Sequence, residues 1–90
     1  MGTVSRPAQA GTLESSDMMV SVAPAAAGTG IQLDLACPTM QQFGQHITGL
    51  IRGIFAECGI TDAVVQANDK GAVDWVIAAR VQTAIRRATQ

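Results

Sequence analysis

The sequence predicts an α+β fold, a two-layer sandwich in which a small mixed sheet of three or four strands is covered on one face by two helices. Two patterns predict it: short segments in which apolar and polar residues alternate, and two long segments in which apolar residues recur every three or four positions. Their order along the chain is β-β-β-α-β-α, and the first strand is the weakest. The 90 residues, 48% of them apolar, leave room for a single domain with a thin core, spanning residues 1–90.

The first part of the chain predicts a hairpin. Residues 1–10 are small and polar, and we expect them to be a flexible lead-in. A short strand is expected at residues 11–14 and a turn at residues 15–17, because Ser and Asp side chains bond to nearby backbone groups. The loose alternation in Met18–Ala23 predicts the second strand. Ser15 would then lie at or beside the hairpin tip.

A loop at residues 24–30 leads into the clearest alternation of the chain, Ile31–Ala36, which predicts a strand with one face toward solvent. The first helix is expected to open at residues 38–39. Its apolar residues recur at helical spacing, and Gly59 is expected to end it as a C-terminal cap.

The last strand is expected around residues 63–67, followed by Asn68 and Asp69 as the cap of the second helix. If residues 31–36 and 63–67 pair in parallel, the helix between them forms a right-handed crossover. Near the end of the second helix we expect a solvated face that carries Arg80, Arg86 and Arg87.

Composition argues against several function classes. The net charge is -1, and with one lysine and three aromatic residues the chain lacks the basic, aromatic face of nucleic-acid binders. No apolar stretch reaches membrane-spanning length and no secretory signal is recognisable, so we expect a cytoplasmic protein without a membrane partner. Cys37 and Cys58 form no CxxC pair and are expected to be reduced and partly buried, although the sequence leaves open whether they touch.

No self-sufficient catalytic or metal site is expected. His46 is the only histidine and falls between the apolar and polar faces of the first helix. Four acidic residues could be combined into an acid pair, but each has an ordinary place at a helix end, turn or cap: Glu57, Asp62, Asp69 and Asp74. The sequence therefore indicates a protein that is not an enzyme by itself.

One segment carries a more specific signal, AGTLESSD at residues 10–17, where two hydroxyls and two acids lie at a turn between apolar runs. By its residue types alone it is a hairpin tip in which Asp17 bonds to backbone. The segment nevertheless resembles the acyl carrier protein of citrate lyase, its gamma chain. Two further matches follow in order: Gln-Phe-Gly at residues 42–44, and Asn-Asp-Lys-Gly-Ala at residues 68–72 with Ala-Arg at residues 79–80.

The resemblance implies a covalent cofactor. In that family the serine directly after Leu-Glu carries 2'-(5''-phosphoribosyl)-3'-dephospho-coenzyme A through a phosphodiester, and here that serine is Ser15. Ser16 stands where many relatives have Gly, and it is the less favoured attachment point. The resemblance also suggests that the attaching transferase recognises Glu14 and Asp17, for which a role in the turn and in solvation is an equal alternative.

The implied function is that of a carrier subunit. Its arm would hold acetyl and citryl thioesters while the transferase and lyase subunits, the alpha and beta chains, convert citrate to acetate and oxaloacetate. The catalytic residues and any magnesium would belong to those partners. Two other readings stay open: the carrier subunit of malonate decarboxylase, whose sequence before the serine differs, and an unmodified α+β interaction module.

Overall fold

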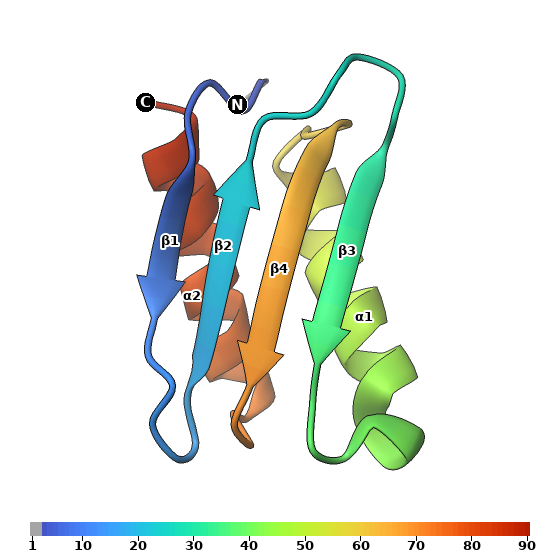
Figure 1. Cartoon of the computed structure of the whole chain (residues 1–90), viewed down its shortest axis with the longest axis vertical. Helices are drawn as coiled ribbons and strands as arrows, with labels where there is room; N and C mark the ends of the chain where they lie inside the picture. The colour runs from blue at the N-terminus through green and yellow to red at the C-terminus, as the bar shows by residue number, and fades with distance from the viewer. Residues whose placement is uncertain (1–2) are drawn as a thin grey trace.

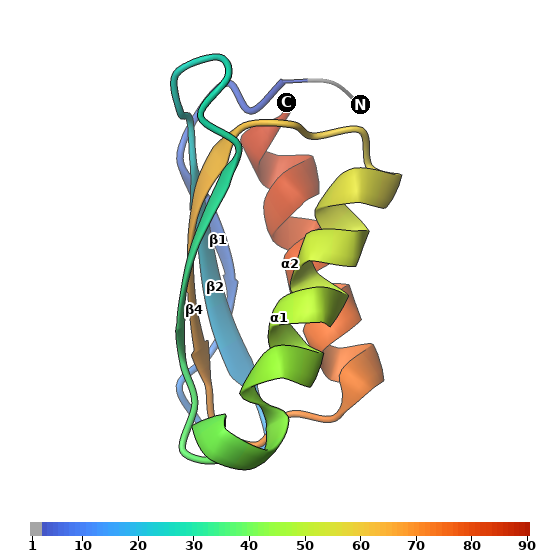
Figure 2. The ribbon, with the colours of Figure 1, turned by 90° about the vertical axis from the view of Figure 1, so that its right-hand side faces the viewer.

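Four strands form one mixed sheet, and two helices pack side by side on one of its faces (Figures 1 and 2). The computed structural model describes residues 3–90. The elements are β1 (Ala8–Gly11), β2 (Met18–Ala23), β3 (Ile31–Ala36), α1 (Met40–Glu57), β4 (Ala63–Asp69) and α2 (Asp74–Ala88). The predicted α+β class, the order β-β-β-α-β-α and the two-layer arrangement are thus confirmed.

The strand order in the sheet is β1-β2-β4-β3. β2 pairs antiparallel with both β1 and β4, whereas β3 pairs in parallel with β4, as expected for two strands joined by a helix. Val65 in the middle of β4 lies opposite Val22 of β2 and Leu33 of β3. The two central strands therefore supply most of the surface on which the helices pack.

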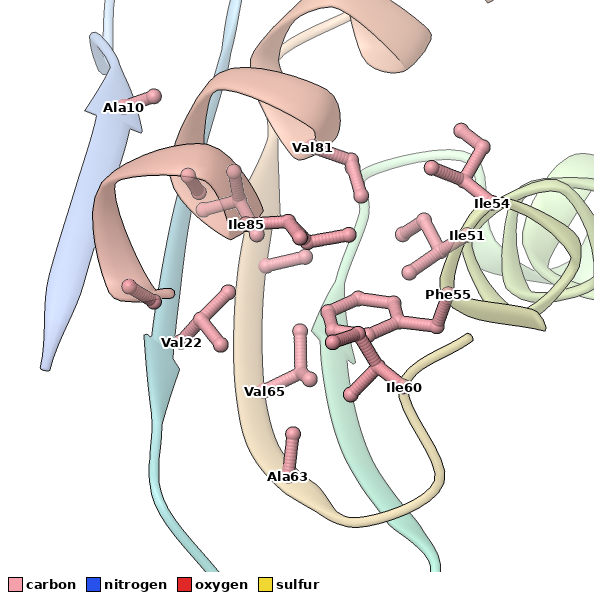
Figure 3. Packing of buried hydrophobic residues seen from close by; sticks show 14 of the residues in the cluster. Ala10, Val22, Ile51, Ile54, Phe55, Ile60, Ala63, Val65, Val81 and Ile85 are labelled. Atoms are coloured by element: carbon pink, nitrogen blue, oxygen red, sulfur yellow. The ribbon is translucent and has the colours of Figure 1, made fainter. Parts of the chain in front are cut away.

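The core lies between this surface and the helices, as Figure 3 shows for the residues that it labels. β2 and β4 alternate buried and less buried residues, because successive side chains point to opposite faces of a strand. α1 and α2 contribute buried residues at helical spacing, among them Ile51, Phe55, Val81 and Ile85, each no more than 1% exposed. The amphipathic stripes that predicted the helices are the surfaces that pack on the sheet.

Gly59 ends α1 as expected. Its φ of +72° is left-handed, and the Ile60 N–H donates to the Phe55 carbonyl across the helix end at 3.0 Å. This is the Schellman arrangement, which satisfies carbonyls that the last helical turn leaves free.

The first strand lies earlier than predicted. It spans Ala8–Gly11, not residues 11–14, so residues 8–10 belong to the sheet and not to a lead-in. The residues before it are also packed: Val4 is 4% exposed, and the Ser5 N–H donates to the Ala88 carbonyl at 2.8 Å. The expectation of a flexible lead-in over residues 1–10 was therefore wrong for Val4, Ser5 and residues 8–10, and residues 1 and 2 lie outside the described range. Pairing with β2 and packing against α2 hold the segment, and neither is visible in its polar sequence.

The start of α2 also differs from the prediction. Asn68 and Asp69 end β4, and the N-cap position of α2 is Val73, which makes no side-chain capping bond. Asp69 is only 2% exposed, and its carboxylate accepts the Ala72 N–H at 3.0 Å and the Cys37 thiol at 3.4 Å. Asp69 therefore shapes the turn between β4 and α2 and does not cap the helix.

The two ends of the described chain meet at one end of the molecule, and the β1–β2 connection lies at the other (Figure 1). The Ser5 and Arg6 N–H groups both donate to the Ala88 carbonyl there, at 2.8 and 3.2 Å. Neither helix within residues 3–90 combines the length and the apolar character needed to cross a bilayer.

Candidate functional site: the Ser15 turn

The six residues that connect β1 to β2, residues 12–17, contain a tight turn that we call the Ser15 turn. The Asp17 N–H donates to the Glu14 carbonyl at 3.2 Å, which places Ser15 and Ser16 at its two central positions. Ser16 has a left-handed φ of +67°, whereas Ser15 is not among the residues with positive φ. This combination defines a type II turn, with Ser15 at the first central position. The prediction of a hairpin with Ser15 at its tip is thereby confirmed.

Asp17 fastens the base of the turn to α2. Its side chain is 13% exposed, and both carboxylate oxygens are bound by Arg80, whose Nε and Nη2 donate at 2.9 and 3.1 Å. The Thr12 hydroxyl and the Met18 N–H donate to the same carboxylate at 2.6 and 2.7 Å. The Arg80 hydrogen bonds, and then those from Thr12 and Met18, hold the pKa of Asp17 well below its ordinary value. The carboxylate is therefore ionised throughout the neutral range.

A second set of bonds fastens the turn to the end of β4. The Ser16 N–H donates to the Lys70 carbonyl at 2.8 Å, and the Lys70 N–H donates to the Asp17 carbonyl at 2.9 Å. These bonds extend the β2–β4 pairing by one step past its last pair, Met18 and Asp69. On the opposite side, Gly11 has a φ of +91°, and a Cβ there would fall 1.7 Å from the Met18 carbonyl oxygen. Only glycine fits at this position in the observed hairpin.

Within this hydrogen-bonded frame, Glu14, Ser15 and Ser16 are exposed, and their side chains make no hydrogen bond to any residue in the described range 3–90. The Ser15 hydroxyl is thus free and accessible while its backbone is held from both sides. Glu14 and Asp17, which the sequence suggested as a matched pair of flanking acids, have different surroundings: Glu14 faces solvent, and both Asp17 oxygens are used inside the protein.

Arg80 was the residue that sequence reasoning assigned wrongly. We expected it on a solvated helix face with Arg86 and Arg87, but its guanidinium holds Asp17 across a separation of 63 residues. The only sequence signal for this role was the Ala-Arg match at residues 79–80, to which no physical role had been assigned. The roles of Thr12 and of the Lys70 backbone in the turn were not anticipated either.

The other polar residues considered earlier lie elsewhere. His46 is exposed and its Nε2 lies 2.9 Å from the Asp74 carboxylate, at the start of α2. Asp62 accepts the Gly30 N–H at 2.8 Å, and this bond is the main cause that lowers its pKa. Cys37 and Cys58 are both free thiols and partly buried. Among residues 3–90, no three His, Cys, Asp or Glu side chains are placed to hold a metal ion together.

The Ser15 turn therefore presents an exposed serine hydroxyl on an anchored backbone, and no basic side chain among residues 3–90 is bonded to that hydroxyl. The chemistry of the site fits a covalent phosphodiester, since an alcohol on a turn that is open to solvent is all that the carrier must supply. Comparison with known proteins identifies the family.

The family model described as malonate decarboxylase delta subunit matches residues 5–88. The citrate lyase acyl carrier protein of Rhodopseudomonas palustris is 52% identical over 83 residues, covering 92% of this chain and 84% of the relative. The proteins of the same name from Klebsiella pneumoniae and Lacticaseibacillus casei are 49% and 44% identical, over 92% and 96% of this chain and 84% and 83% of theirs. The chain therefore belongs to the family of acyl carrier proteins that includes those of citrate lyase.

A solved structure agrees on the fold. A chain in the crystal structure of a Pseudomonas malonate decarboxylase hetero-tetramer in complex with malonate superposes with a TM-score of 0.67, covering 96% of this chain and 91% of that one. The sequence identity is 21%, so this likeness supports the shared fold and nothing finer.

Proposed function

We propose that the chain is the acyl carrier subunit of a citrate lyase, without catalytic residues of its own, and that Ser15 bears phosphoribosyl-dephospho-coenzyme A through a phosphodiester. The observation that carries the proposal is the free hydroxyl of Ser15 at the first central position of an anchored turn. The relatives named citrate lyase acyl carrier protein, at 44% to 52% identity, support the choice of complex. We place its work in the cytoplasm.

The residues in and around the Ser15 turn have different roles in this proposal. Asp17 and Arg80 hold the turn in one conformation, so the hydroxyl is presented to the attaching transferase without an ordering step. Within residues 3–90 no base contacts the hydroxyl, and we expect the transferase to supply the group that removes its proton. Glu14, exposed beside Ser15, is free to contact that enzyme.

When attached, the arm supplies a thiol that carries acetyl and citryl groups as thioesters. The domain keeps the foot of the arm at a defined place, and the tether raises the concentration of the acyl group at the active sites of the partner alpha and beta chains. Citrate cleavage to acetate and oxaloacetate would then use the catalytic residues of those partners.

Ser15 is favoured over Ser16 for a local reason. The Ser16 N–H is bonded to Lys70, and its backbone already occupies a left-handed conformation that few residues with a side chain adopt. Ser15 has neither constraint, so it is the residue better able to adjust in the active site of a transferase.

A second candidate is the carrier subunit of a malonate decarboxylase, which the description of the family model favours. Reconstitution distinguishes the two complexes. The modified chain is expected to restore citrate cleavage when it is mixed with the alpha and beta subunits of citrate lyase, and not to restore malonate decarboxylation with the subunits of that enzyme. The opposite result would transfer the chain to the second complex.

The test of the attachment site is intact mass with peptide mapping, on protein produced together with the prosthetic-group transferase. We expect the added mass of the arm on the peptide that contains Ser15, its loss in Ser15→Ala and its retention in Ser16→Ala. Loss in Ser16→Ala alone would move the site by one residue. A chain that stays unmodified would favour the interaction module without a cofactor.

A further inference from the structure

A groove of about 370 Å³ lies between α1 and the β4–α2 connection, and we call it the Phe43 groove. Phe43, Ile47 and Ala72 form apolar parts of its wall, and His46 and Asp74 stand on its polar side. Phe43 is 50% exposed although it belongs to the apolar stripe of α1, so this groove leaves an aromatic surface open to solvent. Neither the core nor the Ser15 turn requires such a surface.

The Phe43 groove adjoins the Ser15 turn through a single peptide unit. The Lys70 carbonyl accepts the Ser16 N–H at 2.8 Å, and the same peptide continues to Gly71, which lines the groove. Adding the bonds along this path, at standard lengths, places the Cα atoms of Ser15 and Gly71 within about 10 Å of each other. In Figure 1 the β1–β2 and β4–α2 connections lie at the same end of the molecule.

The chemistry of the groove suits the far end of a coenzyme A-type arm. The pantetheine portion of such an arm alternates hydrocarbon segments with amides, and the groove combines an apolar wall with an imidazole and a carboxylate. His46 Nε2 and the Asp74 carboxylate lie 2.9 Å apart, and both side chains are more than half exposed, so each keeps hydrogen-bonding capacity toward a ligand. The volume is at the small end for ligand pockets, which suits one end of the arm and not its whole length.

We propose that the Phe43 groove receives the thiol end of the arm, with its acyl group, between visits to the partner subunits. This inference rests on the proposed attachment at Ser15. The foot of the arm lies close to the groove, and the tether supplies the end of the arm at an effective concentration in the millimolar range. Even weak affinity then populates the docked state, and the arm remains free to leave.

The experiment uses the modified chain, checked first by intact mass, and measures how fast iodoacetamide alkylates the arm thiol. Mass spectrometry of a peptide that contains Ser15 but ends before Cys37 separates this thiol from Cys37 and Cys58. The reference is the same peptide released by protease. If the dissociation constant of the arm for the groove is about one tenth of the effective concentration, the arm is docked most of the time, and alkylation in the folded protein is about tenfold slower than in the peptide.

Phe43→Ala removes the aromatic wall and is expected to bring the rate back toward that of the peptide. Trp75→Ala is the matched control, because Trp75 is a larger aromatic residue, 76% exposed at the start of α2, that does not line the groove. This control is expected to keep the protection. Circular dichroism verifies that both variants fold.

A second measurement avoids substitutions. Amide NMR shifts of the unmodified and modified chains are expected to differ at Gly71, Ala72 and Phe43 as well as in the Ser15 turn. Differences confined to residues 12–18, together with equal alkylation rates in folded protein and peptide, would overturn the groove proposal and leave the attachment at Ser15 standing. Protection that appears only after partner subunits are added would overturn it too, and would make the groove a partner-docking surface. A chain without the arm would instead remove the proposed function itself.

Discussion

Replacing Ser16 by glycine is expected to stabilise the protein, because Ser16 is held at a φ of +67°. A residue with a side chain in this left-handed region costs roughly 1–2 kcal/mol. Glycine relieves that cost but gives the unfolded chain more freedom, which offsets about 0.4–1 kcal/mol. At the middle of both ranges the net gain is about 0.8 kcal/mol, or a rise in Tm of about 3–6 °C for a chain of this size.

Thermal and urea unfolding of the unmodified protein, followed by circular dichroism, measure this gain. Ser15→Gly is the matched control, since Ser15 is the neighbouring central residue of the turn and lacks the positive φ. It gains the same freedom in the unfolded state without relief of strain, so it should lose about 0.4–1 kcal/mol. If both glycine variants were destabilised alike, the left-handed conformation of Ser16 would not carry the assigned strain.

Three further results are expected. Asp17→Asn should lower the urea midpoint at pH 7. Because folding depresses the pKa of Asp17, the ionised carboxylate stabilises the protein above its ordinary pKa of about 3.9, and this stabilisation fades as the pH falls below that value. A difference from wild type that did not shrink below pH 4 would contradict the contact between Asp17 and Arg80. Arg80→Lys should speed amide hydrogen exchange at the Ser15 turn, because an ammonium group cannot reproduce the two hydrogen bonds of the guanidinium to Asp17. The control Arg86→Lys, on the exposed face of the same helix, should leave the exchange rates unchanged. Equal rates in both variants would count against anchoring by Arg80. Ile51→Val, at a position with 0% exposure, should cost about 0.5–1.5 kcal/mol in urea unfolding, and Val64→Ala on the open face of the sheet, 37% exposed, should cost clearly less.

Elements with one buried face could be predicted from the sequence, since burial imposes a period on the residues. Met18–Ala23 and Ile31–Ala36 alternate because one side of each strand faces the helices, and the stripe of α1 follows for the same reason. The strand Ala8–Gly11 escaped prediction because Ala, Gln and Gly have little preference for strands. Hydrogen bonds to β2 and contact with α2 decide its conformation, and α2 is distant in sequence.

For the candidate site, too, local features could be predicted from the sequence and tertiary contacts could not. The turn at Ser15 follows from local chemistry, and the resemblance singled out the serine. Asp69 shows where local chemistry is ambiguous, because an aspartate accepts backbone N–H groups equally well at a helix start and in a buried turn. The pairing of Arg80 with Asp17 is a tertiary contact across 63 residues, and one sequence contains no signal for it apart from the matched Ala-Arg.

Both ends of the described chain lie at the end of the molecule opposite the Ser15 turn, and this position decides where the chain can be reconnected or attached. Residues 5 and 88 are in backbone contact, so a short linker could join them and new ends could be opened in the exposed loop at residues 26–29 without crossing the sheet. A circular permutant of this kind keeps both anchors of the turn. A tag attached at either end would therefore be joined at the end of the molecule that lies opposite the Ser15 turn.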